Sequence, residues 1–71
     1  MTLQEQLRRE IRKAVALSGL TQVAIATAAD VSVGHLGNVL HGRKPVSLAT
    51  AERIADACGV DLRITGHGRW T

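Results

Sequence analysis

The stretch TQVAIATAADVSVGHLGNVLHG, residues 21–42, decides the fold that this chain is expected to adopt. Thr21 is a favourable N-cap, because its hydroxyl can accept a hydrogen bond from an unpaired amide of the first helical turn. The pattern of residues 22–29 predicts a short helix that begins directly after this cap. Ser32 offers the same capping chemistry before a second short helical segment, residues 33–40. We therefore predict two short helices in close succession.

The corner between these two helices makes specific demands on its residues. The turn needs a residue that tolerates a left-handed backbone, and Asp30 is among the few side chains that can replace glycine there. Val31 supplies an apolar plug for the corner, and Ala26 is small enough for the second helix to cross closely. Leu36 and Val39 give the second helix an apolar face to turn inward. Two short helices joined in this way form a helix-turn-helix.

A longer helix is predicted before this unit, over about residues 3–18. Thr2 and Glu5 have the spacing of a capping box, and Gly19 suits a left-handed C-cap. An apolar stripe recurs at every fourth position, at Leu3, Leu7, Ile11 and Val15. The basic residues occupy the other faces, where we expect an ordinary solvated surface; they are Arg8, Arg9, Arg12 and Lys13.

A loop and a fourth helix are predicted after the unit. The glycine and proline within residues 42–45 together stop one helix and start a turn. Ser47 then caps a helix over residues 48–58, which ends at Gly59. Cys58 falls on the apolar stripe of this helix, so we interpret it as a small core residue.

The periodicity changes after residue 59. Apolar and polar residues alternate over residues 60–65, which indicates a strand, and residues 66–71 read as a tail. One strand cannot satisfy its own backbone hydrogen bonds, so we predict that two subunits pair these strands antiparallel across a two-fold axis. The candidate dimerisation residues are Val60, Leu62, Ile64 and Trp70. Residues 1–59 then form the helix-turn-helix domain, and residues 60–71 form the dimerisation element.

Composition narrows the possible functions. A chain of 71 residues is bounded to one domain. Such a domain buries only about 60% of its unfolded surface, so a partner subunit is the expected supplement to its core. Cys58 is the single cysteine, which excludes an intrachain disulfide and a zinc-type cysteine spacing. The chain also lacks a plausible nucleophile–base pair and a Gly-rich phosphate loop after a strand. We therefore expect no enzymatic activity, no cofactor and no metal.

The charge of the chain and its lack of long apolar runs bear on partners and location. The net charge of +3 and the pI of about 10.0 permit nucleic-acid binding without proving it. No apolar run reaches the roughly 20 residues of a membrane span, and the first residues do not have the pattern of a signal peptide. We expect a cytoplasmic protein that does not contact a membrane.

The stretch around residues 21–42 resembles the phage-repressor and Cro-like family, also called XRE-type regulators. The matching positions are Thr21, Gln22, Ala26, Val31, Ser32, Leu36, Val39 and Gly42, followed by Ser47, Leu48, Ile54, Ala55, Gly59 and Val60. Asp30 departs from the usual turn glycine, and Ala51–Glu52 stands where the family often has larger apolar residues. The resemblance implies a small all-α, lambda-repressor-like domain of four to five helices that binds double-stranded DNA, here with the short C-terminal strand added.

The resemblance also implies a role for particular residues. The second helix of the motif, about residues 33–41, enters the major groove, and its outward residues meet base edges. Those residues are Val33, Gly34, His35, Gly37 and Asn38. Phosphate contacts fall to residues at helix starts and in the following loop, namely Thr21, Gln22, Ser32, His41, Arg43 and Lys44.

The chemistry of the base-facing residues can be weighed separately. Asn38 can pair with adenine through two hydrogen bonds, His35 can donate to guanine, and Val33 can contact a thymine methyl. Gly34 and Gly37 offer no side chain and instead allow the backbone to approach DNA closely. We therefore expect few direct base contacts and some dependence on DNA shape.

Three functions remain open at this point. The first is a homodimeric repressor of phage or mobile-element type that binds a palindromic operator. The second is an antitoxin that binds its own operator and a toxin protein. The third is an interaction domain that kept the fold and lost DNA binding, an interpretation that the two glycines slightly favour.

Overall fold

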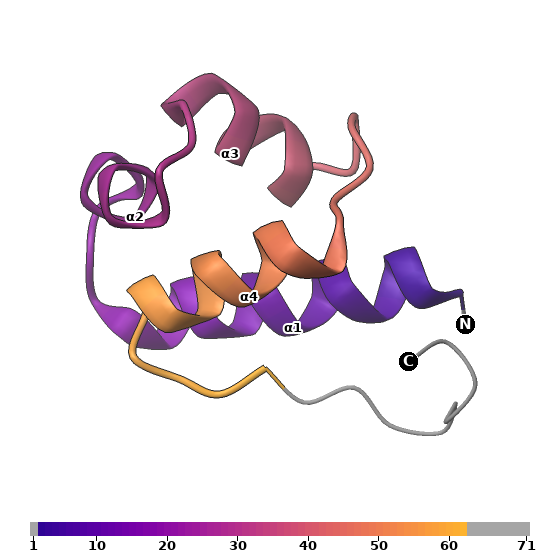
Figure 1. The fold of residues 1–71 in the computed structure, drawn as a ribbon, viewed down its shortest axis with the longest axis horizontal. Coiled ribbons are helices and arrows are strands. Elements are labelled where there is room, and N and C mark those ends of the chain that lie inside the picture. Colours follow the sequence, from indigo (N-terminus) through magenta and orange to yellow (C-terminus); the bar gives the residue numbers. More distant parts are fainter. Residues whose placement is uncertain (1, 63–71) are drawn as a thin grey trace.

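The computed structural model describes residues 2–62, and within them it contains four helices and no strand (Figure 1). The helices are α1 (Leu3–Ser18), α2 (Gln22–Ala29), α3 (Val33–Leu40) and α4 (Leu48–Ala57). α1 and α4 pack side by side, with α3 lying above them and α2 seen end-on at the left of Figure 1. The all-α class and the order of the helices are confirmed. The fourth helix ends one residue earlier than predicted, at Ala57.

Every helix begins at a hydroxyl N-cap. The capping residues are Thr2, Thr21, Ser32 and Ser47, and each accepts a hydrogen bond from the amide three residues further on. At α1 the carboxylate of Glu5 returns the bond, accepting the Thr2 amide at 3.0 Å, so the predicted capping box is confirmed. That bond lowers the pKa of Glu5, because it favours the charged carboxylate.

The corner between α2 and α3 is built on a left-handed aspartate. Asp30 has φ 60° and ψ 45°, and among residues 2–62 it is the one residue other than glycine with a positive φ. Its amide donates to the Thr27 carbonyl, and the Val31 amide donates to the Ala26 carbonyl at 3.0 Å. These bonds satisfy carbonyls that the helix end leaves free. Val31 packs half-buried against the core, as the plug that the sequence predicted.

We expect Asp30→Gly to raise the free energy of unfolding by about 0.5–1 kcal/mol, because glycine adopts this backbone without the steric penalty of a Cβ. Asp30→Ala makes the same change of charge but keeps the penalty and loses the local polar side chain, so we expect a loss of about 1 kcal/mol. Urea denaturation of both variants checks this. Equal stabilities for the two variants would show that the corner is not strained.

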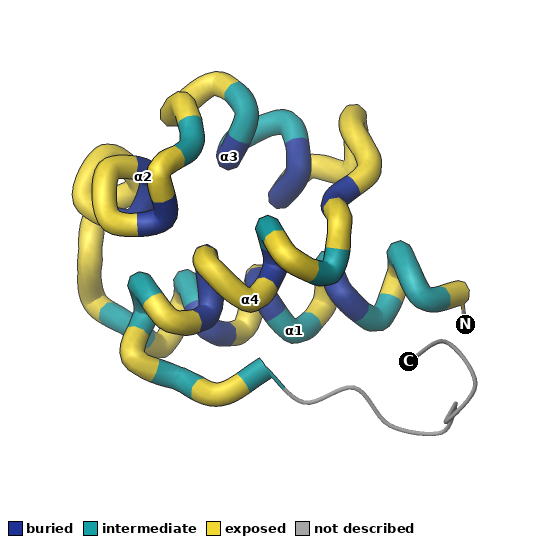
Figure 2. The backbone as a smooth tube through the Cα atoms, in the orientation of Figure 1, coloured by how far each residue is buried: buried dark blue, intermediate teal, exposed yellow. Residues whose placement is uncertain are grey.

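The core lies between the pair α1 and α4 and the pair α2 and α3, where the buried stretches of all four helices face one another (Figure 2). It is aliphatic throughout and contains Leu7, Ile11, Ile25, Ala26, Ala29, Leu36, Val39, Leu40, Val46, Ala51 and Ile54. Ala51 is fully buried at the position where the family resemblance suggested a larger side chain. Small residues there allow α4 to pack closely against α1 and α2.

A side-chain clamp that the sequence did not predict holds the segment before α4. The Gln4 amide group donates to the Val46 carbonyl at 2.6 Å and accepts from the Val46 amide at 2.8 Å. Val46 is only 3% exposed, so its backbone groups need partners inside the protein. The clamp ties the segment between α3 and α4 to the first turn of α1.

The strand predicted for residues 60–65 is not confirmed by the residues that the structure describes. Residues 60–62 form no strand there, and the Val60 amide instead donates to the Ala55 carbonyl at 3.0 Å. That bond belongs to the end of α4, where Gly59 adopts φ 79°. Leu62 packs, partly buried, against the core. The remaining predicted strand residues, including Ile64, and the tail with Trp70 lie outside the described residues.

No single helix within residues 2–62 has the length and apolar character needed to cross a membrane. α2 and α3 meet that criterion only when taken together, by length and composition, and they are bent by 107° relative to each other.

Candidate nucleic-acid interface

α3 is anchored on one side and open on the other. Its inward residues Leu36, Val39 and Leu40 are at most 7% exposed, so they fix the helix on α2 and α1. The angle of 107° between α2 and α3 lies within the roughly 90–120° of a helix-turn-helix. The core therefore holds α3 rigidly, with its outer side free to meet a partner.

The residues predicted to face bases do share this outer side, which we call the reading face: Val33, Gly34, His35, Gly37 and Asn38. Val33 is 43% exposed and Gly34 is also exposed, whereas the other three are half-buried among their neighbours. The side-chain hydrogen bonds formed among residues 2–62 do not engage the amide of Asn38 or the imidazole of His35. Both side chains therefore keep their donors and acceptors for an outside partner.

The two glycines of the reading face have open space above them. A Cβ built on Gly34 or on Gly37 would meet nothing within 4 Å, apart from the helix itself. The fold therefore does not require glycine at either position. In a helix interior, glycine costs about 1 kcal/mol relative to alanine, so Gly37 lowers stability without a packing reason inside the protein. Close approach of an external partner is a physical reason for its presence.

The residues predicted to hold phosphates lie at the ends of α2 and α3. Thr21 and Ser32 are exposed, and each hydroxyl oxygen accepts a helix amide, at 3.1 and 3.0 Å. Gln22 is exposed as the first residue of α2. His41 lies just beyond α3 with its Nδ1 at 2.8 Å from the Gly37 carbonyl oxygen. The carbonyl can only accept, so Nδ1 carries the proton and Nε2 points away from this bond.

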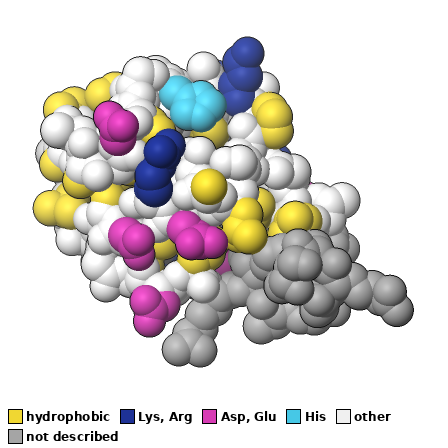
Figure 3. Space-filling model, in the orientation of Figure 1, with side chains coloured by type: hydrophobic (Ala, Val, Ile, Leu, Met, Phe, Trp, Pro, Cys, Tyr) yellow, Lys and Arg dark blue, Asp and Glu magenta, His cyan; other side chains and the backbone are white. Residues whose placement is uncertain are grey.

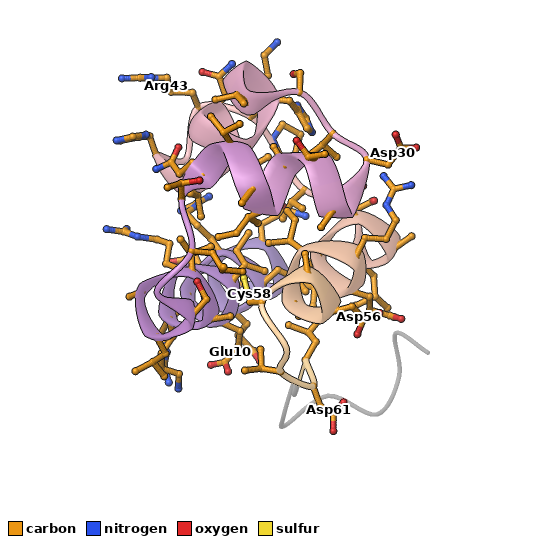
Figure 4. The ribbon with its side chains drawn as sticks, turned by 90° about the vertical axis from the view of Figure 1, so that its left-hand side faces the viewer. Glu10, Asp30, Arg43, Asp56, Cys58 and Asp61 are labelled. Atoms are coloured by element: carbon orange, nitrogen blue, oxygen red, sulfur yellow. The ribbon has the colours of Figure 1, made fainter. Side chains whose placement is uncertain are left out.

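The loop after α3 carries Arg43 and Lys44, both exposed. Their amides donate to the Asn38 carbonyl at 2.8 and 3.4 Å, which fixes the start of the loop against the end of α3. Arg43 lies on the opposite side of the molecule from Asp30 and Asp56 (Figure 4).

Figure 3 shows another face, on which acidic side chains gather around α4 and the α2–α3 corner with a Lys or Arg between them, while a His and a further Lys or Arg lie at the top. Because Arg43 is set apart from Asp30 and Asp56, those two carboxylates would not repel a polyanion that approached the side of Arg43.

The helix α1 carries four basic residues that were predicted to lie on a solvated surface, and two of them, Arg8 and Arg12, lie near the end of α3 or the loop after it. Arg9 and Lys13 fit that interpretation, since both lie within 4.0 Å of the Glu10 carboxylate. Arg8 differs, because its guanidinium lies 3.2 Å from the position that a Cβ on Gly42 would occupy. Arg12 is exposed, as predicted; it forms no ion pair among residues 2–62 and lines a hollow beside α2 and His41. Helical periodicity places Arg8 and Arg12 on one side of the helix and Arg9 and Lys13 on another. The sequence did not show where the loop after α3 would lie.

Metal and thiol chemistry have little support in the described part of the chain. No three side chains of His, Cys, Asp or Glu come together there in a group that could hold a metal ion. Cys58 is half-buried, and this burial raises the pKa of its thiol, although a hydrogen bond with Ser18 acts in the opposite direction. A raised pKa disfavours the reactive thiolate.

Comparison with known families agrees with this geometry. Residues 6–63 match a family described as a helix-turn-helix domain, and this match covers most of the chain. The chain therefore belongs to the helix-turn-helix family of DNA-binding domains, whose members are typically not enzymes. No curated protein matched the chain, and no solved structure did.

Proposed function

We propose that this protein is a transcriptional repressor of phage or mobile-element type that binds a palindromic operator as a homodimer. The observation that carries the proposal is the reading face itself. It belongs to an anchored helix at the corner angle of a helix-turn-helix, and it has free polar groups and two glycines with open space above them.

In this proposal the reading face enters the major groove. Asn38 pairs with adenine through its amide, His35 donates to guanine, and Val33 contacts a thymine methyl. Gly34 and Gly37 bring the helix backbone close to the base edges. With only three side chains to read bases, the operator is also recognised through its shape and deformability.

Phosphate contacts orient the domain on the duplex. Gln22 and the N-cap hydroxyls of Thr21 and Ser32 lie at the starts of the two motif helices. His41, Arg43 and Lys44 follow the end of α3 and hold the neighbouring backbone. Each cation–phosphate contact adds about 0.9 to the slope of log affinity against log salt.

Dimerisation is assigned to residues 60–71. Val60 and Leu62 are half-buried within the described residues and lie directly before Ile64 and the tail with Trp70. A two-fold dimer places its two reading faces about 34–36 Å apart, one turn of DNA, and the operator is then an approximate palindrome.

The test is selection of bound sequences from random duplex DNA by the full chain, with light scattering to measure the mass in solution. We expect two inverted half-sites with centres one helical turn apart, and the mass of a dimer. A selected single half-site, together with a monomer mass, would reject the dimer. Failure to enrich any sequence would reject the repressor.

A further inference from the structure

The loop between α3 and α4 carries Arg43 and Lys44 and is held at both ends. We call this loop, residues 41–46, the cationic loop. At its start, the amides of Arg43 and Lys44 donate to the Asn38 carbonyl at 2.8 and 3.4 Å. At its end, Val46 is buried, and its backbone is held from the first turn of α1. The two cations therefore lie on a loop that is fixed on either side.

The attachment at the end of the loop depends on one side chain. The Nε2 group of Gln4 donates to the Val46 carbonyl at 2.6 Å, and Oε1 of Gln4 accepts from the Val46 amide at 2.8 Å. An exchange of two hydrogen bonds with a single residue is the pairing that an antiparallel strand would provide. Because an amide N–H can only donate and a carbonyl can only accept, this pairing also fixes the orientation of the Gln4 side chain.

No other side chain in the described part of the chain replaces this attachment. Among residues 2–62, Gln4 is the one side chain outside the loop that forms a hydrogen bond with it. Arg8, one turn later on the same face of α1, lies against Gly42 but forms no ion pair or hydrogen bond with the loop. Removal of the Gln4 amide would leave two buried backbone groups unpaired, so the end of the loop would move to reach water.

We propose that Gln4 is a positioning residue for DNA binding, which holds the cationic loop so that Arg43 and Lys44 face the phosphate backbone together. This proposal rests on the DNA-binding function proposed above. A loop without the clamp has to be ordered when DNA binds, and the free energy of ordering is subtracted from the affinity. Gln4 itself contacts no DNA, so its whole effect on affinity passes through Arg43 and Lys44.

The experiment is a double-mutant cycle between Gln4 and the two loop cations, read as affinity for the selected duplex at a salt concentration where every variant still binds. Gln4→Met keeps the length of the side chain and removes its amide. We expect it to weaken binding by about three- to tenfold, which is the cost of ordering the loop. In a background that carries Arg43→Gln and Lys44→Gln, the same substitution should change affinity by at most about twofold, because the groups that it positions are gone.

Gln6→Met is the matched control. Gln6 is also a half-buried glutamine of α1, and its side chain forms no hydrogen bond among residues 2–62. This variant should bind the duplex as the wild type does when the loop is intact, and as the background variant does when the loop cations are removed.

Hydrogen exchange of the free protein reads the clamp without DNA. The Val46 amide should exchange at least about tenfold faster in Gln4→Met and at the wild-type rate in Gln6→Met. Gln4→Glu keeps the acceptor for the Val46 amide, so its exchange rate and its coupling to the loop cations should both be intermediate. This milder variant also carries the test if Gln4→Met does not fold.

Two outcomes would overturn the proposal while leaving DNA binding by α3 intact. Equal losses of affinity for Gln4→Met in the two backgrounds would show that Gln4 acts on the fold as a whole. Faster exchange at Val46 with no loss of affinity would show that DNA binding does not need the clamp. A wild-type protein that binds no duplex would instead reject the proposed function itself.

Discussion

Replacing Leu36 by alanine is expected to lower the free energy of unfolding by about 2–5 kcal/mol. Leu36 is fully buried and is the central inward residue of α3. Its removal leaves a cavity between α2 and α3 that helices held by a tight corner cannot readily close. A domain of this length has a stability of roughly 4–11 kcal/mol at about 0.05–0.15 kcal/mol per residue, so the loss is a large part of the total.

Thermal unfolding followed by circular dichroism measures this effect. Each kcal/mol corresponds to a change of about 4–8 °C in the midpoint for a domain of this size. The matched control is Val33→Ala, on the same helix but 43% exposed, for which we expect a change within about 0.5 kcal/mol. If the two variants were equally stable, α3 would not be anchored as described.

Gly37→Ala is expected to change stability and DNA affinity in opposite directions. The added methyl group meets nothing within 4 Å in the free protein, and alanine favours the helix by about 1 kcal/mol. The melting midpoint should therefore rise by about 4–8 °C. On DNA the same methyl group takes space between the helix and the base edges. We expect a loss of at least about tenfold in affinity for the selected operator, or 1.4 kcal/mol.

Fluorescence anisotropy with a labelled operator measures the affinity. Thr27→Ala serves as a control, because Thr27 is exposed on α2 and its hydroxyl donates to the Val23 carbonyl of the same helix. That variant should gain a little stability and bind the operator as the wild type does. Unchanged or tighter binding by Gly37→Ala would mean that the backbone of α3 does not approach the base edges closely, and the role given to the two glycines would be wrong.

Local chemistry made much of the fold predictable. Hydroxyl caps mark helix starts because the first amides of a helix need acceptors, and the four predicted caps are all found. The left-handed corner at Asp30 was predictable for the same kind of reason, since few residues tolerate that backbone. The caps and the corner determine where α3 begins. Because Leu36 and Val39 turn inward, the residues of the reading face are then left on its outer side.

Contacts between distant segments were not predictable in this way. Gln4 and Val46 are 42 residues apart, and nothing in the local pattern of either indicates the clamp. Arg8 and Arg12 looked like their neighbours Arg9 and Lys13 until the fold placed the loop after α3 beside them. The alternation of residues that begins at Val60 could not reveal that the Val60 amide completes the end of α4.

The most direct test of the reading face is a titration of the isotopically labelled protein with the selected duplex, followed through backbone amide resonances. We predict the largest changes at Val33–Asn38, with further changes at Gln22 and residues 41–44. Glu52 and Asp56, exposed on α4, should change little. Changes centred on α4, or spread evenly over all four helices, would contradict the assignment of α3 as the helix that reads DNA.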